Sequence, residues 1–295
     1  MSLLYLDCIS GISGDMTLAS LVDAGADKAY IEQELAKLQI EPYKIVWKKV
    51  NKNGIAALKA DIVSEHEPHA HRHYSEIVEM IRTAGLPERV VERSLAVFHR
   101  IGQAEAKIHG VPLEHVHFHE VGAVDSIVDI VGVALALESL EVELIYVSPV
   151  PLGYGTVKCA HGIYPVPAPA TLEMMIGLPI ASLQIPKELT TPTGAGIVSS
   201  LAAAFSSTIP EITIKSIGYG AGSRDLPERP NVLRAIVGSM TAQTAIHSHR
   251  DGIEQAAPLH HPHHGHHHDH HHGHHHHDHH HDHQHEHQHD LHHNE

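Results

Sequence analysis

Two histidines, a glutamate and two aspartates stand close together in one short segment of the chain. If the first part of this segment is extended, His117 and His119 point to the same side of the strand. Residues 124–140 are apolar nearly all round, which predicts a buried helix, and Asp125 and Asp129 lie one turn apart on it. Imidazole and carboxylate groups in such a pattern are typical of metal sites and of sites that transfer protons.

A buried carboxylate needs a hydrogen bond, an ion pair or a metal ion to offset the loss of hydration. We therefore predict a divalent metal ion bound by His117, His119 and Asp129, with His119, Glu120 and Asp125 as catalytic residues. The alternative is that Asp125 caps the helix and that Asp129 pairs with a histidine without any metal.

A loop rich in serine and glycine separates a predicted strand at residues 3–6 from a predicted helix at residues 15–23. Backbone N–H groups at such a helix start bind phosphate well, although this is not a Walker loop because no lysine follows. We also count Asp15, at the start of the helix, among the catalytic residues. The predicted phosphate-binding residues of this loop are Ser10, Gly11, Ser13 and Gly14.

Two further segments could bind an anion. Thr191 and Thr193 stand at the start of a helix predicted at residues 194–205, where hydroxyl and N–H groups favour negative charge. The alternative is an ordinary threonine cap, with Gly196 allowing close packing. Arg224 lies in a predicted loop at residues 218–225 and could clamp a phosphate, or else form a surface pair with the neighbouring aspartate.

His161 lies in a segment rich in proline and glycine, residues 155–169, which predicts a rigid loop. Such a loop could hold His161 over a metal site or merely turn a corner. Lone cysteines are more often buried as small apolar residues, and this is the simpler interpretation of Cys8 and Cys159. The other interpretation is a thiolate near a soft metal.

The last 36 residues, from His260 onward, hold 23 of the 35 histidines and one apolar residue. A segment with so little apolar surface cannot offset its ordering entropy, so we predict disorder. Its neutral imidazoles favour nickel, zinc, copper and cobalt, and we interpret it as a metal reservoir rather than an expression tag or a pH sensor. Representative predicted ligands are His267, His271, His275 and His279.

These groups must be positioned by a body that mixes helices and strands. Besides the elements named above, we expect helices at residues 30–38, 75–83, 88–109 and 168–176, a hairpin of residues 43–50 and 54–63, and strands at residues 142–147, 212–217 and 232–237. The predicted fold class is therefore an α/β or α+β globular body at residues 1–245, followed by a disordered His-rich tail at residues 246–295.

Composition excludes several classes of protein. Lysine and arginine total 20 against 35 carboxylates, and the chain without its last 36 residues still carries a charge of −9, so nucleic acid is a poor partner. No apolar run is long enough for a membrane helix. Two cysteines cannot form a disulfide framework, and the N-terminus lacks a basic signal region, so we expect a cytoplasmic protein.

Five motifs, read together and in order, resemble the nickel-insertion protein family of lactate racemase maturation, also described as the pyridinium-3,5-bisthiocarboxylic acid mononucleotide nickel chelatase family. The resemblance covers about residues 1 to 240. The motifs are YLDCISGISGDM (5–16), HFHEVGAVDSIVDIVG (117–132), HGIYPVPAPAT (161–171), ELTTPTGAG (188–196) and GYGAGSRDLPERPNVLR (218–234).

The resemblance implies insertion of Ni(II) into the pyridinium mononucleotide, with formation of carbon–nickel and sulfur–nickel bonds, and apo lactate racemase as the client of the product. Separately from the resemblance, we expect a homo-oligomer, although the sequence does not give the oligomeric state. Members of the family extend into a further domain that holds the CTP site, so we expect CTP with Mn(II) or Mg(II) only if a C-terminal family segment is supplied. The alternatives are a nickel store or chaperone without catalysis and a metal-dependent hydrolase.

Overall fold

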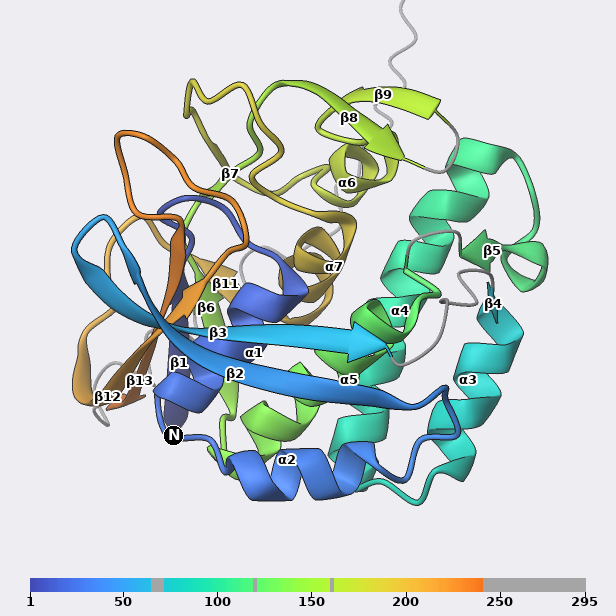
Figure 1. The fold of residues 1–295 in the computed structure, drawn as a ribbon, viewed down its shortest axis with the longest axis horizontal. Helices are drawn as coiled ribbons and strands as arrows, with labels where there is room; N and C mark the ends of the chain where they lie inside the picture. Colours follow the sequence, from blue (N-terminus) through green and yellow to red (C-terminus); the bar gives the residue numbers. More distant parts are fainter. Residues whose placement is uncertain (65–71, 119–120, 160–161, 241–295) are drawn as a thin grey trace, which may run out of the picture. The chain divides into compact units, whose positions relative to one another are not determined.

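The computed structural model describes residues 1–64, 72–118, 121–159 and 162–240. Within these ranges, seven strands form one mixed sheet and further short strands form two-stranded ribbons (Figure 1). The strands of the large sheet, in spatial order, are β11 (Ala204–Phe205), β6 (Leu144–Val147), β1 (Ser2–Asp7), β13 (Val232–Met240), β12 (Ile212–Ala221), β3 (Ile55–Ser64) and β2 (Tyr43–Lys52). The ribbons pair β4 (Arg72–His73) with β5 (His117–Phe118), β7 (Val150–Pro151) with β10 (Ile180–Ala181), and β8 (Gly155–Cys159) with β9 (Gly162–Val166).

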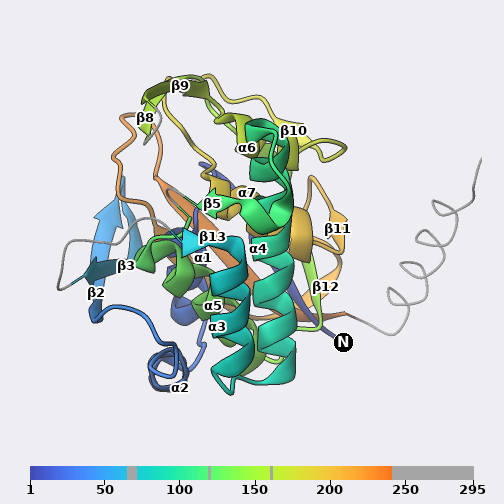
Figure 2. The same cartoon turned by 90° about the vertical axis from the view of Figure 1, so that its right-hand side faces the viewer.

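Helices cover one face of the sheet. Helix α1 lies against β12, β3 and β13, and α5 packs on α1 and on α4. Figure 2 shows α3 and α4 side by side at the outside of this layer. The helices are α1 (Gly14–Asp23), α2 (Lys28–Leu35), α3 (Tyr74–Thr83), α4 (Glu88–His109), α5 (Val124–Ser139), α6 (Pro169–Met174) and α7 (Pro192–Leu201), and residues Leu113–His115 form a 3₁₀ turn. None of the helices in the described ranges is long and apolar enough to cross a membrane.

The core follows from the alternation of side chains along β1. Leu4 and Leu6 face the helices and join the main core, which includes Leu18 of α1, whereas Leu3 and Tyr5 belong to a small cluster on the other face. Helix α5 is buried on nearly every side, as its apolar sequence predicts. The mixed α/β class predicted for the body is confirmed, and the predicted tail lies outside the described residues.

Several predicted boundaries shift in the structure. Helix α7 begins at Pro192 and ends at Leu201, because Ala204 and Phe205 leave the helix and pair with β6. Helix α2 spans Lys28–Leu35 rather than residues 30–38, since the side chain of Asp27 caps its first turn. The other predicted helices and the hairpin of β2 and β3 are present, with ends that differ by a few residues.

The prediction of a loop at residues 218–225 is wrong for its first half, because Gly218–Ala221 continue β12. The glycines are required by the close approach of α1 to the strand. A Cβ atom on Gly218 would lie 2.1 Å from the carbonyl oxygen of Ser20, and one on Gly220 would lie 1.9 Å from that of Met16. Glycine therefore serves here to let a helix rest directly on a strand rather than to make a turn.

Candidate functional site

A cavity of about 440 Å³ opens where three helices begin, at the N-terminal ends of α1, α5 and α7. Its other walls come from the middle of β3, the C-terminal end of α4, the start of α6 and the β8–β9 hairpin, which lies next to α6 at the top of Figure 1. The lining includes no lysine or arginine among the described residues. It includes six carboxylates, from Asp15, Asp61, Glu105, Asp125, Asp129 and Glu188.

Asp129 is the most deeply placed of these carboxylates, with 8% of its surface exposed. It packs against the start of α1 so closely that a Cβ atom on Gly14 would lie 2.5 Å from its Oδ2 atom. Its Oδ1 atom is buried and has no hydrogen-bond partner among the described residues. Burial, reinforced by the charges of Asp15 and Asp125, raises the pKa of Asp129 well above its usual value.

Asp15 extends from the first turn of α1 into the same cavity. The hydroxyl of Ser13 donates a hydrogen bond to its Oδ1 atom, so this hydroxyl does not cap the helix. Burial raises the pKa of Asp15, and the hydrogen bond from Ser13 opposes that shift. Two carboxylic groups with raised pKa values therefore share one corner of the cavity, as in sites that hold a proton or attract a cation.

Asp125 is exposed and accepts a hydrogen bond of 2.8 Å from the amide of Ser126. It is not the N-cap of α5, a place that Ala123 takes, so the interpretation of Asp125 as a capping residue is wrong. Asp125 and Asp129 line the same cavity, as their spacing of one helical turn predicts.

His117 lies on β5 and is exposed, and its ring contacts that of His73 in a tilted arrangement, with 3.5 Å between the ring centres. The cavity is lined by its neighbour Phe118 rather than by His117. In the described part of the chain, no three His, Cys, Asp or Glu side chains are grouped so that they could hold a metal ion. The remaining predicted ligands and catalytic residues of these segments lie outside the described residues. They are His119, Glu120, His161, His267, His271, His275 and His279.

The loop between β1 and α1 contributes only its second half to the cavity. Ser13 and Gly14 line it, whereas Ser10 is buried and donates a hydrogen bond of 2.7 Å to the carbonyl of Pro230. Gly11 has a φ of +103°, and a Cβ atom there would overlap the carbonyl oxygen of Leu189. Ser10 and Gly11 thus fasten this loop to its neighbours.

The segment before α7 confirms the simpler of its two interpretations. Thr191 caps the helix, because its Oγ1 atom accepts a hydrogen bond of 3.2 Å from the amide of Gly194. Gly196 allows close packing, since a Cβ atom there would lie 2.6 Å from Ile101. Thr191 and Thr193 also line the cavity, so the cap and an anion-binding role are compatible.

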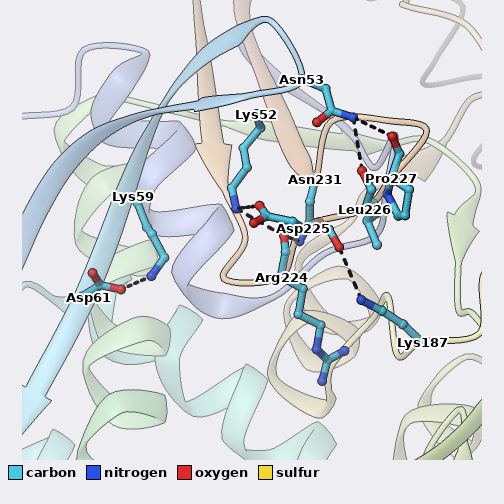
Figure 3. A network of polar contacts seen from close by, with 10 residues as sticks. All are labelled: Lys52, Asn53, Lys59, Asp61, Lys187, Arg224, Asp225, Leu226, Pro227 and Asn231. Atoms are coloured by element: carbon cyan, nitrogen blue, oxygen red, sulfur yellow. Dashed lines mark hydrogen bonds and ion pairs between the residues drawn. The ribbon is translucent and has the colours of Figure 1, made fainter.

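Arg224 lies beside the cavity, where its neighbour Ser223 forms part of the wall. Its guanidinium donates to the backbone carbonyl of Glu188 and lies 3.4 Å from the carboxylate of that residue. A pair with Asp225 does not form, because Asp225 binds Lys52 at 2.6 Å (Figure 3).

Sequence reasoning missed the carboxylates that come from the other walls. Asp61 of β3 lies between Lys59 and Lys48, and hydrogen bonds from these two lysines lower its pKa (Figure 3 shows the contact with Lys59). An aspartate in a strand between apolar residues was the available signal. Glu105 and Glu188 gave no signal of their own, since each is one of many charged residues on a helix or in a loop.

Comparison with curated proteins finds similar sequences in several bacteria. The curated relatives include proteins of Geobacillus kaustophilus (55% identity over 254 residues), Staphylococcus epidermidis ATCC 12228 (52% over 233) and Desulfitobacterium hafniense (49% over 240). Each is named pyridinium-3,5-bisthiocarboxylic acid mononucleotide nickel insertion protein. The matches cover 83%, 79% and 81% of this chain and 62%, 58% and 59% of the relatives, so the chain spans about three fifths of their length.

The comparison with solved structures gave no significant match. The family model described as nickel insertion protein matches residues 4–257, which include every wall of the cavity. The chain therefore belongs to the nickel insertion protein family.

Proposed function

We propose that this chain provides the nickel- and mononucleotide-binding part of an enzyme that inserts Ni(II) into pyridinium-3,5-bisthiocarboxylic acid mononucleotide. The observation that carries the proposal is the acidic cavity, in which the buried Oδ1 atom of Asp129 has no partner among the described residues. Membership of the family supports nickel as the metal, and the names of the relatives support the organic substrate.

The chemistry of the substrate explains why carboxylates are useful. A nickel ion held by both sulfur atoms of a ring substituted at positions 3 and 5 lies against the ring carbon between them. When nickel bonds to that carbon, the C–H bond breaks, the carbon keeps the electron pair and the proton passes to a base. We propose Asp15 and Asp125 as the acceptors of this proton, together with Glu120 and, when it does not bind nickel, His119. Asp129 would be a nickel ligand together with His119 and His161, whereas His117 lies outside the cavity.

Charge suggests where the two ends of the substrate lie. A mononucleotide with two thiocarboxylates and a phosphate is an anion, and six carboxylates around an empty cavity would repel it. We propose that nickel enters first and neutralises the cavity. The phosphate would then lie at the rim, near Arg224 and the hydroxyl groups of Thr191 and Thr193, with Ser13 and Gly14 as further contacts and Ser10 and Gly11 as supports of that loop.

The remaining proposals go beyond the described residues, and this chain spans about three fifths of the length of the curated relatives it matches. We propose a cytoplasmic homo-oligomer in which residues 1–245 form the body and residues 246–295 a His-rich reservoir, with His267, His271, His275 and His279 among its ligands. CTP with Mn(II) or Mg(II) would act on a C-terminal family segment, and apo lactate racemase would receive the product.

The test is an insertion assay with the full chain, Ni(II) and the pyridinium substrate, with and without CTP, Mn(II) and a C-terminal segment from a relative. We expect the absorbance of the nickel product to appear when all components are present. Asp15→Asn and Asp125→Asn should abolish or strongly reduce it. Glu211→Gln, an exposed carboxylate outside the cavity, is the matched control and should leave it unchanged.

Two outcomes would contradict the proposal. If no condition yields product while the chain still binds many nickel ions, it is a store rather than a part of an enzyme. If product forms at the normal rate in the variant that replaces both Asp15 and Asp125, the cavity is not the site of insertion.

A further inference from the structure

The β4–β5 ribbon presents two imidazole rings side by side on its outer face. His73 and His117 are directly opposite each other in the antiparallel register, and their ring centres are 3.5 Å apart with 48° between the ring planes. His117 is exposed and His73 is partly exposed. The two rings therefore meet at the surface, where a small ion can reach them.

The ribbon that carries these rings is held firmly in place. Phe118 follows His117 on the strand but points inward, where it is 1% exposed and contacts the rings of Tyr74 and Phe98. The amide of Tyr74 donates a hydrogen bond of 3.0 Å to the carbonyl of Val116, and Arg72 binds the carbonyl of Gly122. The backbone thus fixes the spacing of the two histidines. His73 is also the N-cap of α3, where its amide donates a hydrogen bond of 2.9 Å to the carboxylate of Glu76.

Opposed residues on neighbouring strands have Cβ atoms about 4.5–5.5 Å apart, a spacing from which two side chains can reach one ion. The two tilted rings must turn slightly so that a nitrogen of each faces the same ion, which a change of side-chain torsion angles would accomplish. Neutral imidazole nitrogens favour nickel, copper, zinc and cobalt over magnesium and calcium, which prefer oxygen. Water would complete the coordination.

We propose that His73 and His117 form a surface site that binds a transition-metal dication through two imidazoles. The site is outside the cavity but adjoins its wall, because Phe118, the next residue after His117, lines the cavity from the other face of the ribbon. For a chain of this family, the expected ion is Ni(II). The β4–β5 ribbon would separate this ion from the carboxylates that line the cavity. The inference goes beyond the proposed insertion reaction and does not depend on it.

The test must resolve individual histidines, because the many other histidines of the full chain also bind nickel. We would modify the full chain with diethylpyrocarbonate in a metal buffer that fixes free Ni(II), and measure each histidine by peptide mass spectrometry. At free nickel of about ten times the dissociation constant, mass action leaves roughly one site in eleven open, so modification of His73 and His117 should fall about tenfold. Mg(II) should have no such effect.

The matched control is His115, an exposed histidine on the neighbouring turn, whose modification nickel should leave unchanged. Cooperation between the two ligands is tested with His73→Ala and His117→Ala, each of which should remove the protection of the other histidine. Circular dichroism of both variants checks that they remain folded. Protection of His117 that persists in His73→Ala, or that Mg(II) produces equally, would overturn the proposal. If the wild-type chain shows no insertion activity in the complete assay but nickel still protects His73 and His117, the proposed function fails and the surface site stands.

Discussion

Replacing Gly220 with alanine should destabilise the protein strongly, although the change adds only one methyl group. The new Cβ atom would lie 1.9 Å from the carbonyl oxygen of Met16 and 2.7 Å from the amide nitrogen of Ser20. Both contacts are to the backbone of α1, which cannot move aside as a flexible side chain can. Helix α1 and strand β12 must therefore separate at the centre of the fold.

The expected magnitude follows from the nature of these contacts. Added methyl groups in a well-packed core cost about 1–3 kcal/mol, and we expect at least the upper value here because the obstruction is backbone. For a protein of this size, 1 kcal/mol lowers the melting temperature by roughly 2–4 °C, so the predicted fall is about 6–12 °C or more. Thermal unfolding followed by circular dichroism, in the presence of EDTA, measures it.

Gly132→Ala is the matched control. Its Cβ atom would lie 3.0 Å from the side chain of Leu18, which can rotate, and alanine favours the helical conformation of α5 by about 1 kcal/mol over glycine. The two effects nearly cancel, so the melting temperature should change little. If Gly220→Ala melts within two or three degrees of the wild type, about 1 kcal/mol, the close approach of α1 to β12 is not a requirement of the fold.

Two further predictions rest on buried ionisable groups. Burial raises the pKa of the Cys8 thiol to about 12, and only the thiolate reacts with thiol reagents. A thiol reagent at neutral pH should therefore label Cys159 and reach Cys8 only after denaturation. Rapid labelling of both cysteines in the folded protein would contradict the burial of Cys8. The raised pKa of Asp129 means that the folded state binds more protons than the unfolded chain, so this residue lowers stability as pH rises above about 4. The stability of Asp129→Asn relative to the wild type should therefore increase as pH rises above about 4 in urea unfolding with EDTA, whereas that of Glu211→Gln, exposed and outside the cavity, should not.

Local sequence determined much of the secondary structure. The turn between β2 and β3 was predictable because Asn53 and Gly54 adopt positive φ values of 48° and 90°, which asparagine and glycine tolerate best. Gly110 ends α4 in the left-handed conformation for the same reason. Helix α5 was predictable because a helix apolar on all sides has to be buried.

Tertiary contacts determined what the sequence did not reveal. Gly218 and Gly220 are typical of a loop when read locally, and their place in β12 depends on a helix some two hundred residues earlier in the chain. The cavity likewise gathers Asp61, Glu105 and Glu188 from a strand, a helix and a loop, and no spacing rule connects such segments. The pair of Asp125 and Asp129 was predictable because a single helix fixes it.

The pairing of β1 with β13 has a consequence for synthesis of the protein. The two strands are joined from Ser2 opposite Ser239 to Asp7 opposite Arg234, and β13 also joins β1 to β12. The half of the sheet that contains β1 and β6 therefore has no connection through hydrogen-bonded strands to the half that contains β12, β3 and β2 until residue 240 has left the ribosome. Contacts so distant in sequence form slowly, so the body should fold after translation of β13 and as one unit.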